Sequence, residues 1–121
     1  MSVKNQGCIE VSGDSKTAVV AFATPTITDV QQITAASERL KRYVQKNHPK
    51  TVVFDFAAVK FFSSQVLGLI LATRANLLPA GGEVVISGIN PQLHRIFKIT
   101  NLDRIFRFSL DRDSAVKNKQ Q

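Results

Sequence analysis

The chain contains few of the residues on which disulfides, metal sites and catalytic centres depend. Among 121 residues there are one cysteine and two histidines. The single cysteine, Cys8, cannot form an internal disulfide, and one cysteine with two distant histidines does not match a zinc-binding pattern. No secretory leader pattern opens the sequence. We therefore expect a cytoplasmic protein that holds no metal and needs no cofactor.

Long apolar segments are also missing. The longest uninterrupted run of apolar residues and glycine, residues 66–72, is far shorter than the ~20 residues that are needed to cross a bilayer. The sequence therefore predicts no transmembrane segment.

Candidate catalytic groups are scarce and lie in contexts typical of surfaces. His48 precedes a proline in a turn, and His94 lies beside Arg95 on a short helix, so we expect both imidazoles to face solvent. No glycine-rich phosphate loop is present, because Gly81-Gly82 follows a helical pattern, where such a pair ends the helix. The sequence therefore predicts no catalytic residues and no enzymatic activity.

The charge balance favours the positive sign. Sixteen Lys and Arg residues against nine Asp and Glu residues give a net charge of +7 and an isoelectric point near 10.0. Such a chain attracts polyanions and acidic protein surfaces. However, the basic residues are scattered, and most aromatic residues are phenylalanines in apolar contexts, so no nucleic-acid-binding motif is formed. Nucleic-acid binding is therefore not expected.

Length and composition predict one domain. A chain of this length with 44% hydrophobic residues can bury a core without disulfides or metals. We assign the domain to residues 8–116 and expect flexible ends at residues 1–7 and 117–121. Patterns of apolar residues predict strands at 8–11 and 17–22, joined by a hairpin turn.

A helix is predicted to follow the hairpin. Apolar or small residues recur at helical spacing from Asp29, which with Thr28 is a candidate cap, and the run Asn47-His48-Pro49 ends the helix. The positions expected to face the core are Val30, Ile33, Ser37, Leu40 and Val44.

Strands and helices alternate in the rest of the chain. The β-branched and aromatic run at residues 51–56 predicts a strand that is buried on both faces. Further strands are predicted at 83–87 and 105–108, with a short helix from Pro91 and a brief helix after Asp111. The order β-β-α-β-α-β-α-β-(α) predicts an α/β fold with a mixed, mostly parallel sheet flanked by helices.

The second long helix is predicted to begin at two adjacent serines, Ser63 and Ser64. A helix start exposes unpaired N–H groups and the positive end of the macrodipole, so a hydroxyl there can carry an anion. The pair is a candidate for a regulated serine, although a serine in this position, taken alone, is more often a simple N-cap. Asp55, in the preceding strand, either adjoins this site or accepts bonds from nearby backbone N–H groups. The apolar side of the helix is expected to consist of Val66, Leu67, Ile70, Leu71, Leu77 and Leu78.

The segment VVFDFAAVKFFSSQVLGLI, residues 52–70, resembles the central signature of the STAS family, the sulfate-transporter and anti-sigma-factor-antagonist domain. That signature is a strand that ends in Asp, a short apolar turn, and roughly Asp-Ser-Ser-Gly-Leu-Gly at the start of a helix. Downstream, residues 81–106 (GGEVVISGINPQLHRIFKITNLDRIF) are similar to the family's Gly-Gly, strand, proline-led helix and Leu-Asp run. In the aligned positions, Asp55 matches the strand acid, Ser63 the second Asp, Ser64 the phosphorylatable Ser, Gln65 the next Ser, Val66 the Gly, and Leu67-Gly68 the Leu-Gly.

The resemblance implies a freestanding bacterial anti-sigma factor antagonist, which is a non-enzymatic regulator of transcription. Unphosphorylated, such a domain binds an anti-sigma factor that is itself a serine protein kinase. Phosphorylation at the helix start, here Ser64 with Ser63 as the alternative, then releases the partner. The implied partner-binding residues are Asp55, Ser63, Ser64, Gln65, Val66 and Gly68.

Two other functions stay open. The same fold can be a constitutive scaffold or subunit of a stress-signalling or lipid-transport complex, in which Ser64 has no switching role. Alternatively, the basic residues bind polyanions or membrane surfaces, and the two serines only cap the helix. An esterase role is not expected, because Ser64 lacks the glycine pattern of a nucleophile elbow.

Overall fold

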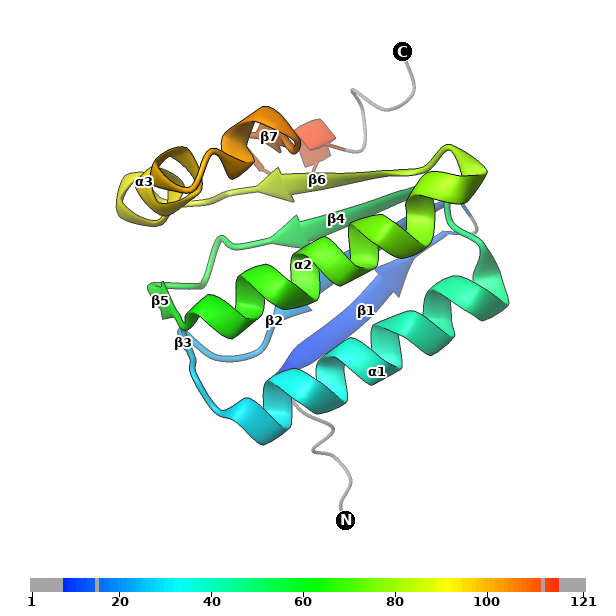
Figure 1. Ribbon diagram of the computed structural model, residues 1–121, viewed down its shortest axis with the longest axis horizontal. Coiled ribbons are helices and arrows are strands. Elements are labelled where there is room, and N and C mark those ends of the chain that lie inside the picture. The colour runs from blue at the N-terminus through cyan, green and yellow to red at the C-terminus, as the bar shows by residue number, and fades with distance from the viewer. Residues whose placement is uncertain (1–7, 15, 112, 116–121) are drawn as a thin grey trace.

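A five-stranded β-sheet forms the centre of the protein. The computed structural model describes residues 8–14, 16–111 and 113–115, so the predicted flexible ends at 1–7 and 117–121 and the predicted domain limit at residue 116 lie outside the described residues. The strand order is β1-β2-β4-β6-β7; β1 runs antiparallel to β2, and the other neighbouring pairs are parallel (Figure 1). The strands are β1 (Ile9–Gly13), β2 (Thr17–Phe22), β4 (Thr51–Asp55), β6 (Glu83–Ser87) and β7 (Arg107–Ser109).

Three helices longer than a single turn connect the strands in the described chain. They are α1 (Val30–Asn47), α2 (Ser64–Leu77) and α3 (Pro91–Ile99). Helices α1 and α2 lie side by side across one face of the sheet, and α3 lies beyond the end of β6 (Figure 1). All three contribute buried residues to the same hydrophobic core. The predicted α/β fold with a mostly parallel sheet is therefore confirmed.

Local sequence signals account for the ends of α1 and α3. Asp29 caps α1 by accepting a hydrogen bond from the Gln32 N–H at 3.1 Å, and the helix ends where His48 adopts a left-handed conformation with φ of 50°. Asn90 caps α3 in the same way, accepting from the Leu93 N–H at 2.9 Å. Each cap satisfies a backbone donor that a helix start leaves unpaired.

Side chains of the sheet alternate between its two faces. Val52 and Phe54 of β4 join the main core beneath the helices, whereas Val53 points to the other face and joins a smaller cluster. Because β4 lies in the middle of the sheet, all of its residues are buried, as the unbroken apolar run predicts. The smaller cluster consists of Val19, Val53, Val85 and Ala115.

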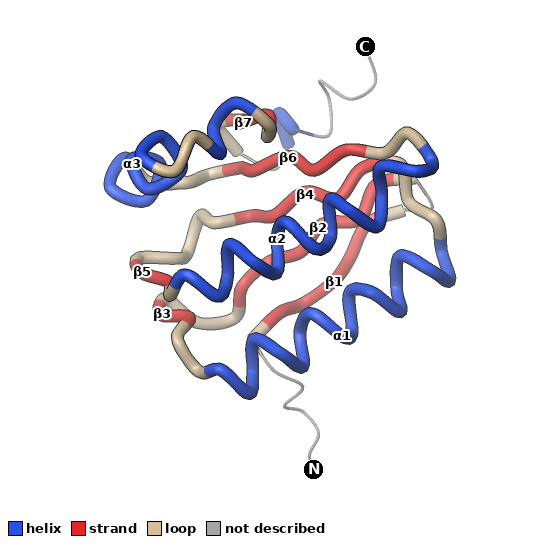
Figure 2. The backbone as a smooth tube through the Cα atoms, viewed as in Figure 1, coloured by secondary structure: helices blue, strands red, loops and turns tan. Residues whose placement is uncertain are grey.

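Two very short strands are absent from the sequence prediction. Strands β3 (Thr26–Ile27) and β5 (Phe61–Phe62) pair in parallel immediately before α1 and α2 (Figure 2). A two-residue strand is too short to produce the alternating pattern by which strands are recognised. This ladder ties the start of α1 to the start of α2, so it positions the candidate serines.

The buried side of α2 differs from the one that we expected. Leu71 and Leu78 are exposed, at 36% and 48%, whereas Leu69 and Thr73 are buried. A helix that is apolar on nearly all sides gives no signal for which side meets the sheet. The buried residues of the helix are Val66, Leu69, Ile70, Thr73 and Leu77.

Three further expectations need correction. Val30, at the first position of α1, is 53% exposed and does not face the core. The last strand begins at Arg107 rather than at residue 105, because a 3₁₀ turn at Leu102–Arg104 delays it. His94 is partly buried rather than solvent-facing, with its ring centroid 4.5 Å from that of Phe108.

Candidate functional site

The start of α2 is anchored by one buried aromatic residue and one backbone hydrogen bond. Phe62 of β5 is 3% exposed, and its ring centroid lies 5.5 Å from that of Phe56 and 6.2 Å from that of Phe97. One residue later, the Ser63 N–H donates to the Ile27 carbonyl of β3 at 2.9 Å. These contacts hold the serine pair at a defined place on the surface.

Ser63 occupies the N-cap position of α2 without capping the helix through its hydroxyl. Its backbone is extended, with φ of −84° and ψ of 165°, and its carbonyl accepts from the Val66 N–H at 3.0 Å. The hydroxyl instead donates to the Gln65 Oε1 at 3.1 Å. The N-cap interpretation is therefore correct for the Ser63 backbone, whereas the Ser63 side chain makes no capping bond.

Ser64 is the first residue of α2, and it is exposed. The first turn of the helix contains no acidic residue. The positive end of the helix dipole is therefore not neutralised by a carboxylate of that turn. An anion attached to the Ser64 oxygen would meet a favourable field from the helix.

Apart from Ser64, Gln65 and Asn76, the exposed residues of α2 are small or apolar. Gly68, Leu71, Ala72 and Ala75 are exposed, and a Cβ added at Gly68 would meet no other atom within 4 Å. Val66 is fully buried, so its side chain lies against the core and does not obstruct the approach of another molecule. Of the implied partner-binding residues on α2, Ser64, Gln65 and Gly68 are thus accessible, and Val66 is not.

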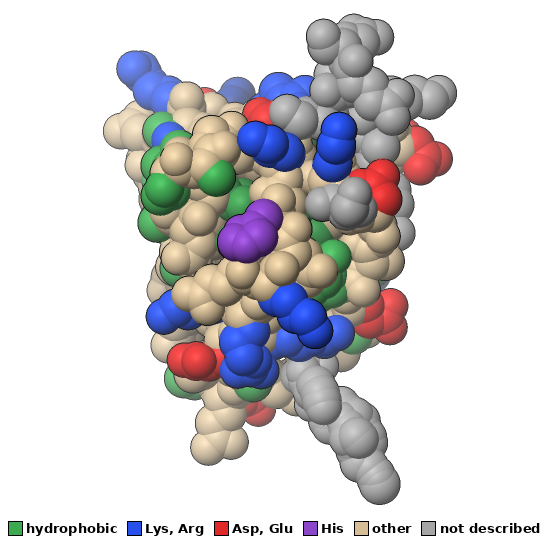
Figure 3. Space-filling model, turned by 90° about the vertical axis from the view of Figure 1, so that its right-hand side faces the viewer, with side chains coloured by type: hydrophobic (Ala, Val, Ile, Leu, Met, Phe, Trp, Pro, Cys, Tyr) green, Lys and Arg blue, Asp and Glu red, His purple; other side chains and the backbone are tan. Residues whose placement is uncertain are grey.

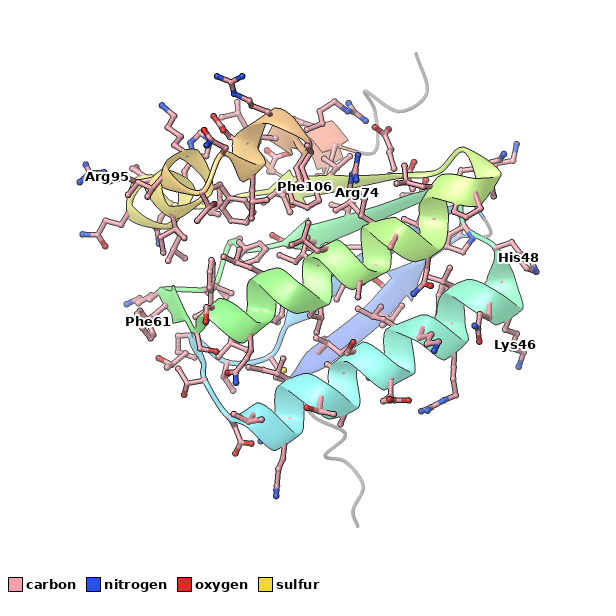
Figure 4. All side chains as sticks on the ribbon, viewed as in Figure 1. Lys46, His48, Phe61, Arg74, Arg95 and Phe106 are labelled. Carbon is pink, nitrogen blue, oxygen red and sulfur yellow. The ribbon has the colours of Figure 1, made fainter. Side chains whose placement is uncertain are left out.

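Phe61 adds an exposed aromatic ring beside the serines. It is 53% exposed, in contrast to the next residue, Phe62, which is 3% exposed. Figure 4 shows Phe61 on the outside of the molecule, at the end where α2 begins. The alternation of side chains along β5 explains why one ring is buried and the other is not. The sequence analysis did not single out Phe61, because the strand could not be recognised.

A shallow groove between α1 and α2 adjoins the same helix start. Its volume is about 230 Å³. Glu38 lies on the α1 side and Gln65 on the α2 side, so the groove reaches the first turn of α2. The residues that line it are Ile33, Thr34, Ser37, Glu38, Gln65 and Leu69.

Asp55 ends β4 and shapes the turn that follows. Its side chain is buried, at 9% exposure, and its Oδ1 accepts from the Ala57 N–H at 3.0 Å. The next residue, Phe56, donates its N–H to the Ser87 carbonyl at 2.8 Å. The bond from Ala57 favours the structural interpretation of Asp55, as an acid that satisfies a backbone donor in the turn.

The described residues contain no group of three or more His, Cys, Asp and Glu side chains that could hold a metal ion. Cys8 is buried, and desolvation raises the pKa of its thiol, which disfavours the reactive thiolate.

His48 lies at the opposite end of the molecule from Phe61, and so from the candidate site at the start of α2 (Figure 4). Within the described ranges, no helix combines the length and the hydropathy that crossing a membrane requires.

Basic side chains are dispersed on the end of the molecule at which α1 and α2 terminate. Figure 3 shows Lys and Arg side chains above and below the histidine of that face, with other surface between them. A continuous basic stripe, which would favour binding along a polyanion, is not visible in that view.

A comparison with family models gives one match, to the STAS domain, over residues 10–115. The match covers most of the chain and includes the strand, the serine pair and the downstream segment on which the sequence resemblance rests. The protein therefore belongs to the STAS domain family.

Several solved structures share the fold. The anti-sigma factor antagonist SpoIIAA in its unphosphorylated form is 14% identical, with 93% of this chain and 96% of that chain matched at a TM-score of 0.83. The Bacillus cell fate determinant SpoIIAA in its phosphorylated form is 14% identical, with 91% of this chain and 97% of that chain matched at a TM-score of 0.73. An anti-sigma factor antagonist from Mycobacterium paratuberculosis is 23% identical, with 100% of both chains matched at a TM-score of 0.79. At these identities the likenesses show a shared fold.

Proposed function

We propose that the protein is a non-enzymatic anti-sigma factor antagonist of bacterial transcription. In its unphosphorylated form it binds an anti-sigma factor that is a serine protein kinase, and phosphorylation at Ser64 releases this partner. The observation that carries the proposal is the placement of Ser64, exposed at the start of α2 and next to the uncharged outer side of that helix. The occurrence of SpoIIAA, a domain of the same fold, in phosphorylated and unphosphorylated forms supports it.

The physical effect of the phosphate differs between the free domain and the complex. A phosphate on Ser64 adds about −1.5 to −2 charges. In the free domain the first-turn N–H groups and the helix dipole favour that charge, so the fold survives the modification. In an interface packed on the helix start, the same group adds a desolvation cost and repels acidic neighbours. A loss of about 3 kcal/mol weakens binding more than a hundredfold.

Ser64 is the preferred acceptor of the two serines. Ser63 is partly buried, its hydroxyl donates to the Gln65 side chain, and its N–H donates to the Ile27 carbonyl. Ser64 is exposed and follows this anchored residue. A kinase can therefore reach the Ser64 hydroxyl without breaking the contacts that fix the helix start.

The test is recovery of the tagged protein from its native cells, followed by intact-mass measurement and identification of the co-purified proteins. We expect a serine-kinase anti-sigma factor among them, and a phosphate-sized mass increment that maps to Ser64. The increment should disappear in Ser64→Ala and persist in the matched control, Ser63→Ala. Full phosphorylation of Ser64→Ala would assign the acceptor role to another residue. An unmodified chain recovered with transporter or scaffold subunits would favour a constitutive STAS subunit instead.

A further inference from the structure

Three arginines from distant parts of the sequence line one concave site at the far end of α2 from Ser64. Arg74 comes from the last turn of α2, Arg104 from the 3₁₀ turn at Leu102–Arg104, and Arg107 from the start of β7. The site has a volume of about 300 Å³. Figure 4 shows the Arg74 side chain rising from α2 close to Phe106, which also lines the site.

The charges of this site do not cancel. Among the described residues that line it, Glu83 is the one acidic residue, against three arginines, which leaves two net positive charges. The Glu83 Oε2 and the Arg107 Nη2 form an ion pair at 2.7 Å, with both side chains about one third exposed. Arg74 and Arg104 form no ion pair with any described residue. Two guanidinium groups are thus available for a ligand.

Apolar side chains lie next to these cations. Leu78 and Ile105 line the site and are 48% and 40% exposed, whereas Val84 and Phe106, which also line it, are buried. Guanidinium groups bind phosphate oxygens in pairs of parallel hydrogen bonds, and adjacent apolar surface strengthens such bonds by excluding water. The volume is at the lower limit of the ~300–1,000 Å³ typical of small-molecule pockets.

We propose that this pocket binds a small organic phosphate, with the phosphate group between Arg74 and Arg104 and the organic part against Leu78 and Ile105. A phosphomonoester dianion matches the two uncompensated positive charges, and the exposed leucine and isoleucine match an apolar substituent. This ligand site is separate from the helix start at Ser64, so it does not rest on the proposed function.

Phenyl phosphate is a suitable probe, because it joins one phosphate dianion to one apolar ring. It is titrated into the ¹⁵N-labelled full chain at constant ionic strength in a phosphate-free buffer, with backbone and arginine Nε–H signals followed by NMR. We expect saturable shifts at Arg74, Arg104 and Ile105. Inorganic phosphate, which lacks the ring, and benzoate, which has one negative charge, should both bind more weakly.

The double variant Arg74→Gln/Arg104→Gln should lower the affinity for phenyl phosphate by about tenfold or more, since it removes two charged hydrogen-bond donors. Arg95→Gln is the matched control, because Arg95 is exposed on α3 and lies outside the pocket; it should leave the affinity unchanged. Well-dispersed spectra of both variants establish that they are folded.

Three results would overturn the proposal. The first is an unchanged affinity in the folded double variant. The second is a set of non-saturating shifts spread equally over Arg95 and the exposed lysines, which would show general attraction of anions to a basic protein. The third is benzoate binding as tightly as phenyl phosphate, which would remove the assignment to a dianion. Each result leaves the Ser64 switch untouched.

Discussion

The two ends of α2 present different chemistry to the surroundings. Its first turn lies on the side of the sheet where β4 and β6 end. This turn carries the exposed Ser64 and contains no charged residue. Its last turn lies near the starts of β6 and β7 and carries Arg74 beside two further arginines. One helix therefore has a neutral surface at one end, where we propose that a protein partner binds, and a cationic pocket at the other.

This difference shows how a phosphate can have opposite effects within one domain. At the helix start the phosphate would be covalent, and its charge would act against an interface that packs there. At the arginine pocket a phosphate would be a bound ligand, and its charge would be neutralised by guanidinium groups. The location of the charge relative to the contacting surface decides whether it breaks or forms a complex.

The largest expected effect comes from removing Phe62, the buried residue that anchors the start of α2. Phe62→Ala deletes a buried ring that contacts Phe56 and Phe97, so it should lower the free energy of unfolding by about 3–5 kcal/mol, as measured by urea denaturation. Phe61→Ala, at the exposed neighbour, should change this quantity by less than about 0.5 kcal/mol. Similar losses in both variants would contradict the assigned packing of β5.

Charge at the helix start is the next largest effect. Phosphorylated Ser64 should bind the co-purified anti-sigma factor more than about a hundredfold more weakly than the unmodified chain, as measured by calorimetry. Ser64→Asp, with one negative charge, should show a smaller loss in the same direction. Ser64→Ala should bind as tightly as the wild type. Equal affinities of all four forms would place the interface elsewhere and favour a constitutive subunit.

A smaller change tests the exposed side of α2. Gly68 has open space around its Cα, so Gly68→Ala should raise the free energy of unfolding by about 0.5–1 kcal/mol, because alanine favours the helix. The added methyl group should at the same time weaken binding of the anti-sigma factor. Gly82→Ala is the contrasting variant, since its Cβ would lie 2.9 Å from the Lys50 carbonyl oxygen, and it should destabilise the domain. Unchanged partner binding in Gly68→Ala would exclude this side of α2 from the interface.

The smallest effect concerns the turn between β1 and β2, on the side of the sheet where β2 and β4 begin. The Asp14 carboxylate accepts from the Lys16 and Thr17 N–H groups at 2.9 Å each, and these bonds lower its pKa in the folded state. A lowered pKa stabilises the fold above the unfolded-state value of about 3.9, and the contribution is lost as the pH falls through the folded-state pKa. Asp14→Asn should be slightly less stable than the wild type at neutral pH and equally stable in acid. A stability difference between the two proteins that stays the same from neutral pH into acid would contradict this account.

Most of the fold was predictable because its signals are local. The cap at Asp29 and the continuous apolar run of β4 depend on a few neighbouring residues, and their predictions were confirmed. The serine pair was also recognisable, since a strand, an apolar turn and a helical pattern follow one another around it. The ladder of β3 and β5 was not recognisable, because two residues in each strand carry no periodic pattern.

The burial of α2 is the clearest case in which local pattern was insufficient. Its sequence is apolar on nearly all sides, so the expected stripe included Leu71 and Leu78, which are exposed, and omitted Leu69 and Thr73, which are buried. The rotation of this helix on the sheet follows from its contacts with α1 and β6, which lie outside the helix itself. Only those contacts determine which side of α2 a partner can reach.

The amino-acid sequence by itself determined the order of strands and helices, the family, and the position of two serines at a helix start. Periodicity, capping residues and contiguous motifs act over a few residues, so they can be recognised along the chain. Tertiary structure alone decided that Phe61 is exposed, that Leu69 and Thr73 are buried, and that Arg74, Arg104 and Arg107 meet in one pocket. Those properties depend on parallel strand pairing and helix packing between segments far apart in the chain, and local sequence carries no signal for them.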